Sequence, residues 1–228
     1  MVTRLFCPKL WRRSHLRDSP IDRAVADTKL KAVLFRGAPH PGSEERAFYA
    51  QWGYKKEAMQ AFIALLRAVN VGGTGKLPMS ELKAMCEAAG FKSVKTYIAS
   101  GNVVFKSGKS EAEVKATLEA ALAAYAGKPV GVMVRTAPEM AAVLSANPFH
   151  GVPGNRTVAI FLDAPPPRDT LGKVAGQVRE ELALGRREIY GYYPDGQGES
   201  KLTIPAAKNG TARNMNTVAK LAQMAQGL

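Results

Sequence analysis

The sequence predicts an α+β fold made of two ferredoxin-like units behind a poorly structured N-terminal extension. From Gln60 onward, β-branched runs and apolar residues at helical spacing follow the order βαββαβ. This order is typical of an antiparallel sheet with helices on one face. The pattern partly recurs after residue 155, whereas residues 1–58 show no sustained period. We therefore expect a first unit at 59–147 and a second, more irregular unit at 148–228, packing together as one domain.

The composition is that of a basic globular protein. The 228 residues include 32 Lys and Arg against 19 Asp and Glu, a formal net charge of +13. Such a charge favours anionic partners, although basic proteins that bind no polyanion also carry it. Two cysteines exclude a disulfide framework and favour a reducing compartment. No apolar run approaches the ~20 residues of a membrane span and no signal peptide begins the chain, so we expect a cytoplasmic protein without membrane contact.

The first 58 residues differ in character from the rest. They carry arginines, prolines and scattered aromatics, and offer little periodic apolar surface to offset chain entropy. At Met59 the pattern changes abruptly to "MQAFIALLRAV". One hypothesis is that translation naturally begins at Met59 and that the upstream part is a gene-start artefact. The other is a real basic arm that contacts a polyanion, and N-terminal sequencing of the native protein distinguishes the two.

The elements of the first unit follow from short β-branched runs and helical apolar spacing. Ser110 followed by Glu113 is a capping box that begins the longer helix. Gly101 and Asn102 separate two strand patterns by two residues, which predicts a tight hairpin turn. The expected strands are 61–69, 94–100, 103–106 and 129–136, and the expected helices are 79–89 and 110–126.

The second unit is predicted with shorter elements. A helix in "PEMAAVLSAN" links the units, and "RNMNTVAKLAQMAQ" forms a closing amphipathic helix with Val218, Leu221 and Met224 on its apolar face. Between them we expect a strand at 156–162, a helical stretch at 169–179, strands at 181–184 and 188–193, and a short helix after "PDGQGESKL".

Three separated motifs resemble one known family. They are "FIALLRAVNVGGTGKLPMSEL", "VKTYIASGNVVF" and "SKLTIPAAKNGTARNMNTVAKL", in this order from about Met59 to the C-terminus. Their pattern resembles that of the domain-of-unknown-function 1697 family, which implies a small bacterial α+β protein with no established activity. The resemblance also implies a start near Met59. Ala68 stands where the family usually has glycine, and Met215 where it usually has an aromatic residue, which weakens a stacking role at Met215.

The glycine-containing segment "RAVNVGGTGKLPMSEL" does not match a known phosphate loop. Alignment with Walker A places Asn70 at the first glycine and Leu77 at the magnesium-binding hydroxyl. The spacing of the glycines also excludes the dinucleotide fingerprint. Two alternatives stay open. Gly72, Gly73 and Lys76 bind an anion before the next helix, or the segment is a turn in which Asn70 bonds the local backbone.

Arg67 is the most specific candidate for ligand binding in this segment. It follows a strand that is apolar on both faces, and a buried guanidinium needs a partner. Either a bound anion or a protein carboxylate would satisfy it.

The other two motifs supply further polar candidates. The glycines, serine and lysine of "GQGESKL" suit either an anion-binding helix start or a plain N-cap at Ser200. Arg213 is expected to reach outward, with Asn214 or Asn216 capping the last helix. "TYIASGN" offers residues that are more usual in turn and sheet chemistry. The predicted ligand-binding residues are Arg67, Asn70, Gly72, Gly73, Lys76, Tyr97, Ser100, Asn102, Ser200, Lys201, Arg213, Asn214 and Asn216.

Three functions remain in competition. The first is a module that binds a phosphorylated metabolite or nucleotide in a cleft between the units, which predicts that Arg67, Lys76, Lys201 and Arg213 converge. The second is a nucleic-acid binder, which Arg135 or Lys95 on an open sheet face would favour, although the strands lack the aromatic RNP pattern.

The third function is an enzyme acting on an anionic substrate, with Tyr97 or His150 carrying protons. His150 lies in the loop "NPFHGVPG", where a histidine is more often solvated. Cys86 is expected to be a buried, inert thiol on a helical face. No histidine and cysteine cluster has metal spacing, so we expect neither a metal nor a cofactor.

Overall fold

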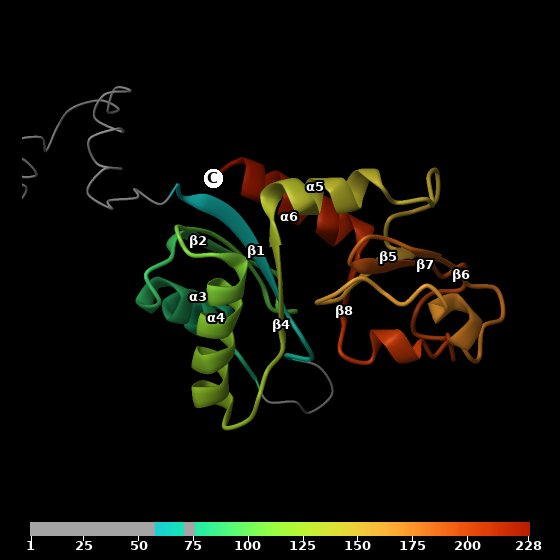
Figure 1. The fold of residues 1–228 in the computed structure, drawn as a ribbon, viewed down its shortest axis with the longest axis horizontal. Helices are drawn as coiled ribbons and strands as arrows, with labels where there is room; N and C mark the ends of the chain where they lie inside the picture. The colour runs from blue at the N-terminus through green and yellow to red at the C-terminus, as the bar shows by residue number, and fades with distance from the viewer. Residues whose placement is uncertain (1–57, 71–75) are drawn as a thin grey trace, which may run out of the picture. The chain divides into compact units, whose positions relative to one another are not determined.

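The computed structural model describes residues 58–70 and 76–228. Gly72, Gly73 and nearly all of the predicted extension lie outside these residues. Residues 57–228 form one compact unit. The described part holds eight strands in two four-stranded antiparallel sheets, together with four α-helices and two short 3-10 helices (Figure 1). The predicted α+β class is therefore confirmed, and no described helix has the length and apolarity to cross a membrane.

The first sheet has the strand order β2-β3-β1-β4, with every neighbouring pair antiparallel. β1 lies between β3 and β4, so that Ile63 of β1 is opposite Val104 of β3 on one side and Arg135 of β4 on the other. The strands are β1 (Gln60–Leu66), β2 (Lys92–Tyr97), β3 (Asn102–Ser107) and β4 (Val132–Thr136).

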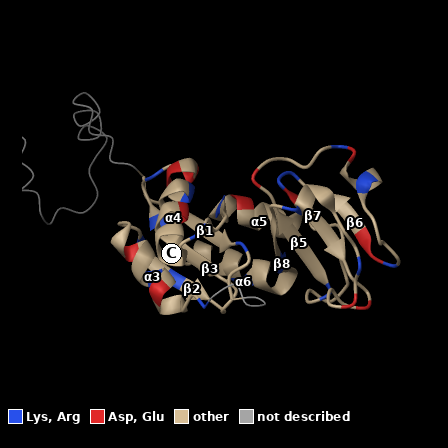
Figure 2. Ribbon diagram, turned by 90° about the horizontal axis from the view of Figure 1, so that it is seen from below, with Lys and Arg blue, Asp and Glu red and all other residues tan. Residues whose placement is uncertain are grey.

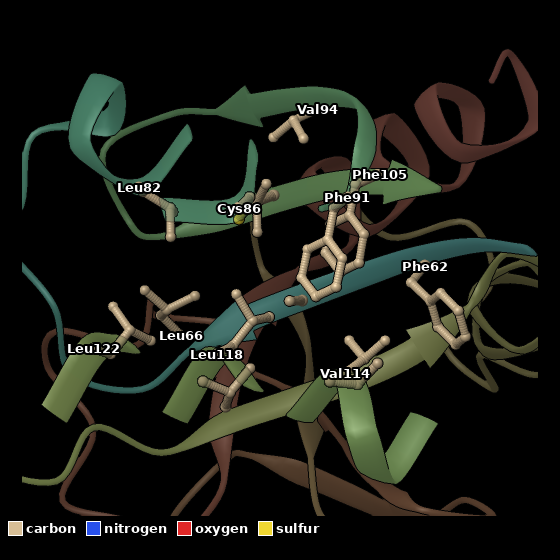
Figure 3. Close-up of a cluster of buried hydrophobic side chains, with 14 of the residues drawn as sticks. Phe62, Leu66, Leu82, Cys86, Phe91, Val94, Phe105, Val114, Leu118 and Leu122 are labelled. Carbon is tan, nitrogen blue, oxygen red and sulfur yellow. The ribbon is translucent and has the colours of Figure 1, made fainter. Parts of the chain in front are cut away.

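Helices cover both faces of this sheet, because β1 is apolar on both sides. Phe62 and Leu66 pack under α3 (Met79–Ala88) and α4 (Glu111–Ala126), in the cluster drawn in Figure 3. Ile63 and Leu65 point to the opposite face, toward α5 (Ala137–Ser145) and α6 (Met215–Gln226). Alternate side chains of a strand point to opposite faces, so the unbroken apolar run "FIALL" reflects burial on both sides.

The second sheet repeats the same connectivity with shorter elements. Its order is β6-β7-β5-β8, again fully antiparallel. Short 3-10 helices stand where the first sheet has α-helices: η1 (Thr170–Lys173) and η2 (Pro205–Ala207). The strands are β5 (Thr157–Phe161), β6 (Glu181–Leu184), β7 (Glu188–Tyr192) and β8 (Thr211–Asn214).

One apolar cluster joins the two sheets. It contains Leu65 and Val104 from the first sheet, Phe161 and Tyr190 from the second, and Val218 of α6. In Figure 1, α5 and α6 run side by side above the first sheet. The two predicted halves therefore share a core.

The hairpin between β2 and β3 differs from the prediction. The connection is residues 98–101, and Asn102 is the first residue of β3, paired with Tyr97. Ile98 (φ 48°) and Gly101 (φ 75°) both have positive φ. The Gly101 carbonyl accepts a hydrogen bond from the Leu66 N–H at 2.8 Å, so contact with β1 fixes the loop.

The helix expected at 169–179 is also wrong beyond its first turn. Only Thr170–Lys173 is helical, as a 3-10 turn. Ala175 instead pairs with Thr203 in an isolated β-bridge. Gly176 (φ 70°) meets the Lys201 carbonyl so closely that an added Cβ would clash with it. A close backbone approach of this kind needs glycine.

The helix starts predicted from capping residues are largely correct. The Ser110 side chain accepts from the Glu113 N–H, and the Glu113 carboxylate accepts from the Ser110 N–H at 2.8 Å. Asn214 caps α6 by accepting from the Thr217 N–H at 2.9 Å. A second capping box, Thr136 with Glu139, begins α5 and was not predicted.

Candidate functional site

A cavity of about 510 Å³ lies beside the carboxyl end of β1. Three cationic side chains line it: Arg67 directly after β1, Lys76 before α3, and Lys128 between α4 and β4. No carboxylate occurs among its described lining residues. Arg67 and Lys76 belong to one sequence motif, and the fold brings Lys128 to them from a distant segment.

Local backbone geometry sets the positions of two of these cations. Gly127 ends α4 in the left-handed conformation (φ 66°), which turns the chain at Lys128 back toward β4. The Arg67 N–H donates to the Gly131 carbonyl at 2.9 Å. A Cβ on Gly131 would lie 3.7 Å from both Cβ and Cδ of Arg67, so the arginine stem passes close over this glycine.

The rest of the cavity wall is apolar. Val69, Leu77 and Leu122 are buried side chains of the first core, and Val130 packs beside them. Ala68, Ala126 and Pro129 are exposed, as is Tyr125, whose surface is 48% exposed. The cavity therefore combines cations with an apolar wall and one accessible aromatic ring.

Arg67 pairs with no carboxylate of the described residues, which leaves the anion alternative open. β1 ends at Leu66, so the arginine lies outside the sheet and is only partly buried. Its Nη2 donates to the Lys208 carbonyl at 2.7 Å. Within residues 58–70 and 76–228 no ion pair involves Arg67, Lys76 or Lys128.

Asn70 acts as a turn residue, as the second alternative predicted. Its Nδ2 donates to the Leu77 carbonyl at 3.0 Å and to the Ala99 carbonyl at 2.7 Å, and its Oδ1 accepts from the Leu77 N–H at 2.8 Å. Asn70 thus ties residue 70 to residue 77 across the glycine-containing segment. Both donors of its amide are used in this way.

Arg213 is the clearest correction, because its guanidinium is buried rather than reaching outward. It makes five hydrogen bonds to neutral acceptors, which uses the full set of arginine N–H donors. Burial lowers the pKa of Arg213 to about 10. The acceptors are Asn102 Oδ1 (2.5 Å), Thr211 Oγ1 (2.7 Å) and the carbonyls of Ala212 (2.8 Å), Leu66 (2.8 Å) and Ser100 (2.9 Å).

The "TYIASGN" residues belong to the same structural network. Asn102 is fully buried and donates from Nδ2 to the Tyr97 carbonyl at 3.0 Å and to Ser100 Oγ at 3.1 Å. Tyr97 packs against the shared core. The second and third sequence motifs therefore contact each other, through Asn102 and Arg213, and hold β8 against the first sheet.

Ser200 and Lys201 do not join the cavity. The Ser200 hydroxyl donates to the Glu180 carboxylate and accepts from the Leu202 N–H at 3.1 Å, so it caps no helix. With the Val178 and Arg179 N–H groups, Ser200 holds the pKa of Glu180 down at about 2. The side chain of Lys201 is exposed. Of the four residues predicted to converge, only Arg67 and Lys76 line one cavity.

Asn216 has an exposed position in the first turn of α6. A Cβ on Gly154 would lie 3.1 Å from its Cγ, so the amide packs against that glycine. Asn214, not Asn216, is the cap.

A second polar cluster was missed by the sequence analysis. Arg187 forms a bidentate ion pair with Glu111 at 2.6 and 3.2 Å and lies 3.5 Å from Glu139. Hydrogen bonding to Glu111 raises the pKa of Arg187. Arg135 is 1% exposed and donates to the carbonyls of Leu162 and Arg187. Burial and the charge of Arg187 lower the pKa of Arg135.

This cluster lines a smaller cavity of about 310 Å³ between α5 and the β6–β7 turn. The capping-box glutamate Glu139 and the turn "LGRR" were the only sequence signals for it. Its carboxylates are already occupied, since Glu188 accepts from the Arg186 N–H at 2.9 Å and the Arg187 N–H at 3.1 Å. The cluster therefore ties α4 and α5 to β7.

The expected catalytic groups stay dispersed. His150 is exposed in its loop, and neither His150 nor Tyr97 lines a cavity described above. Cys86 is fully buried, and burial, followed by the charge of Glu87, raises its pKa to about 12. No three His, Cys, Asp or Glu side chains gather in a possible metal site in the described ranges.

The fold and these motifs define a two-sheet α+β protein with a cation-lined cavity at the end of β1. The chain belongs to the family described as "Protein of unknown function (DUF1697)", whose model matches residues 59–190. The predicted membership is confirmed, although the matched range ends before the third motif.

Among solved structures, the chain is similar to a conserved bacterial protein from Streptococcus pneumoniae. The two share 25% sequence identity with a TM-score of 0.63, over 74% of this chain and 99% of that protein. No curated protein matches the sequence.

Proposed function

We propose that this protein binds a small organic anion in the cavity at the carboxyl end of β1. The observation that carries the proposal is the lining itself: Arg67, Lys76 and Lys128 face one volume of about 510 Å³ without a carboxylate among the described lining residues. Cavities of this size suit small ligands. An anion there would neutralise three like charges that the described protein residues leave without ion pairs.

The site differs from the predicted one in position. The sequence analysis placed the ligand between the two units, whereas this cavity belongs to the first sheet and its helices. The second half contributes through the carbonyl of Lys208, the residue that ends η2, which accepts a hydrogen bond from Arg67. Because the three cations are at least partly solvated, we expect anion binding to weaken as ionic strength rises.

Nucleic-acid binding receives less support. Helices cover both faces of the first sheet, and Arg135 is buried instead of lying on an open face. Lys95 is exposed, but on the edge strand β2. Both signs of charge occur on α3 and α4 (Figure 2), where Lys83 pairs with Glu87 and Lys115 with Glu119. A continuous basic surface is the usual electrostatic footprint of nucleic-acid binding.

We also infer that each half is a ferredoxin-like unit. In the first half the order βαββαβ combines with the strand order β2-β3-β1-β4, and all neighbouring strands are antiparallel. The second half has the equivalent order β6-β7-β5-β8. The shared apolar cluster supports the expectation that the two units pack as one domain.

The proposed function is tested by calorimetric titration of the full chain with AMP, inorganic phosphate and a short RNA. We expect AMP to bind, and Arg67→Ala, Lys76→Ala and Lys128→Ala each to weaken it about tenfold, or about 1.4 kcal/mol. Lys83→Ala is the matched control, since it removes an exposed lysine of α3 that does not line the cavity.

Equal losses in Lys83→Ala and the three cavity variants would show that only net charge matters. Tight RNA binding that the cavity substitutions leave unchanged would favour the nucleic-acid alternative instead. Absence of any binding would refute the proposal.

A further inference from the structure

The cavity lining also indicates the chemistry of the uncharged part of the ligand. Besides the three cations it contains alanine, valine, leucine, proline, glycine and Tyr125. Of the described lining residues none is Ser, Thr, Asn, Gln, Asp or Glu. Apart from the cationic groups, the Tyr125 hydroxyl is thus the single polar side-chain group that those residues present.

Resting on the proposed function, we propose that the ligand is an organic anion with an aromatic body, such as an aryl phosphate or aryl carboxylate. Its charged head lies among Arg67, Lys76 and Lys128, and its ring lies against Tyr125 and the apolar wall. Sugar phosphates that carry no aromatic ring are disfavoured.

A sugar phosphate without an aromatic ring would lose hydrogen bonds in this cavity. Each hydroxyl that leaves water needs a protein partner, because a buried polar group without one is costly. The described lining places cations at the head and leaves Leu77, Leu122 and Val130 as the wall, and the side chains of these three residues have no hydrogen-bonding group. A ring that carries no hydroxyls loses no hydrogen bonds to water there, and it buries apolar surface.

Tyr125 supplies the positive argument for a ring. It lies in the last turn of α4, three residues after the buried Leu122, so both side chains face the same side of the helix. About half of its surface is exposed although it is large and aromatic. Aromatic rings pack favourably on each other in offset or edge-to-face geometry, beyond the gain from area alone. A ligand ring would cover this exposed surface.

The test compares three probes by calorimetric titration of the full chain: inorganic phosphate, glucose 6-phosphate and phenyl phosphate. We expect phenyl phosphate to bind about tenfold more tightly than the other two. Tyr125→Ala should abolish this preference while leaving inorganic phosphate unchanged, and Tyr125→Phe should keep it. Leu144→Ala, which removes an exposed apolar side chain from α5, should change nothing.

The outcomes separate the two proposals. Equal affinity for all three probes, or tightest binding of glucose 6-phosphate, would overturn the aromatic ligand and leave the anion site standing. A preference for phenyl phosphate that survives Tyr125→Ala would also overturn it. If none of the probes binds, the proposed function fails as well.

Discussion

Arg67 and Arg213 are the same kind of side chain in opposite environments. Arg67 lies at a cavity, and its side chain makes one hydrogen bond within residues 58–70 and 76–228, to a neutral carbonyl. Arg213 is buried and makes five. The sequence analysis assigned both to ligand binding. The comparison teaches that an arginine whose donors are all used serves the fold, whereas one with unused donors at a cavity can serve a ligand.

The largest effect should come from Arg213→Ala. It leaves acceptors from β1, β3 and the 98–101 loop without their donor, in a place that water reaches poorly. We expect a loss of about 3–5 kcal/mol in the free energy of unfolding, measured by urea denaturation. Arg67→Ala should change it by less than about 1 kcal/mol. Similar losses of unfolding free energy in the two variants would show that the two arginines do not differ in their structural role.

Gly101→Ala should have the next largest effect. The residue has φ 75°, and an added Cβ would lie 2.8 Å from Leu66 Cβ and even closer to Val69. Strain and overpacking together should cost about 2–3 kcal/mol, seen as a lower midpoint in thermal unfolding. Gly90→Ala, at φ 85° with nothing nearby, isolates the backbone strain and should cost less. An equal cost would show that the contact with β1 is unimportant.

Ala68→Gly should stabilise the protein modestly. Ala68 has φ 50°, in the left-handed region that disfavours side chains, and it lines the cavity. Glycine there relieves strain of about 1 kcal/mol, partly offset by greater entropy of the unfolded chain. We expect a small rise in the melting temperature. A fall would mean that the methyl group packs productively in the cavity wall, which would sharpen the description of the site.

The smallest effect concerns Glu180 and is confined to acid pH. Its pKa is lowered from 4.5 to about 2, so its ionised form stabilises the folded state above pH 4.5. This contribution should be lost as the pH falls from 4.5 toward 2. Glu180→Gln should flatten that part of the stability profile, measured by urea denaturation at each pH. An unchanged profile would show that the Ser200 contact does not hold the carboxylate.

The elements that the sequence predicted well are those specified by neighbouring residues. The capping box of Ser110 and Glu113 closes within four residues, and the cap at Asn214 also acts locally. β8 was missed because "TARN" carries no strand signal of its own. It becomes a strand by pairing with β5, where Ala212 lies opposite Ile160. The helix beyond Lys173 failed for a similar reason, since Ala175 pairs with Thr203.

The sequence by itself determined the α+β class, the apolar run that is buried on both faces, the helix starts and the family. Each of these features depends on the periodicity of apolar residues, on hydrogen bonds between residues close in sequence, or on the order of the sequence motifs. Only the tertiary structure decided which polar residues have spare donors. Arg213 is saturated by acceptors more than 100 residues away, at Leu66, Ser100 and Asn102, whereas Arg67 meets Lys76 and Lys128 around a cavity. Hydrogen-bond saturation depends on neighbours in space, and these neighbours are set by the pairing of strands and the packing of helices.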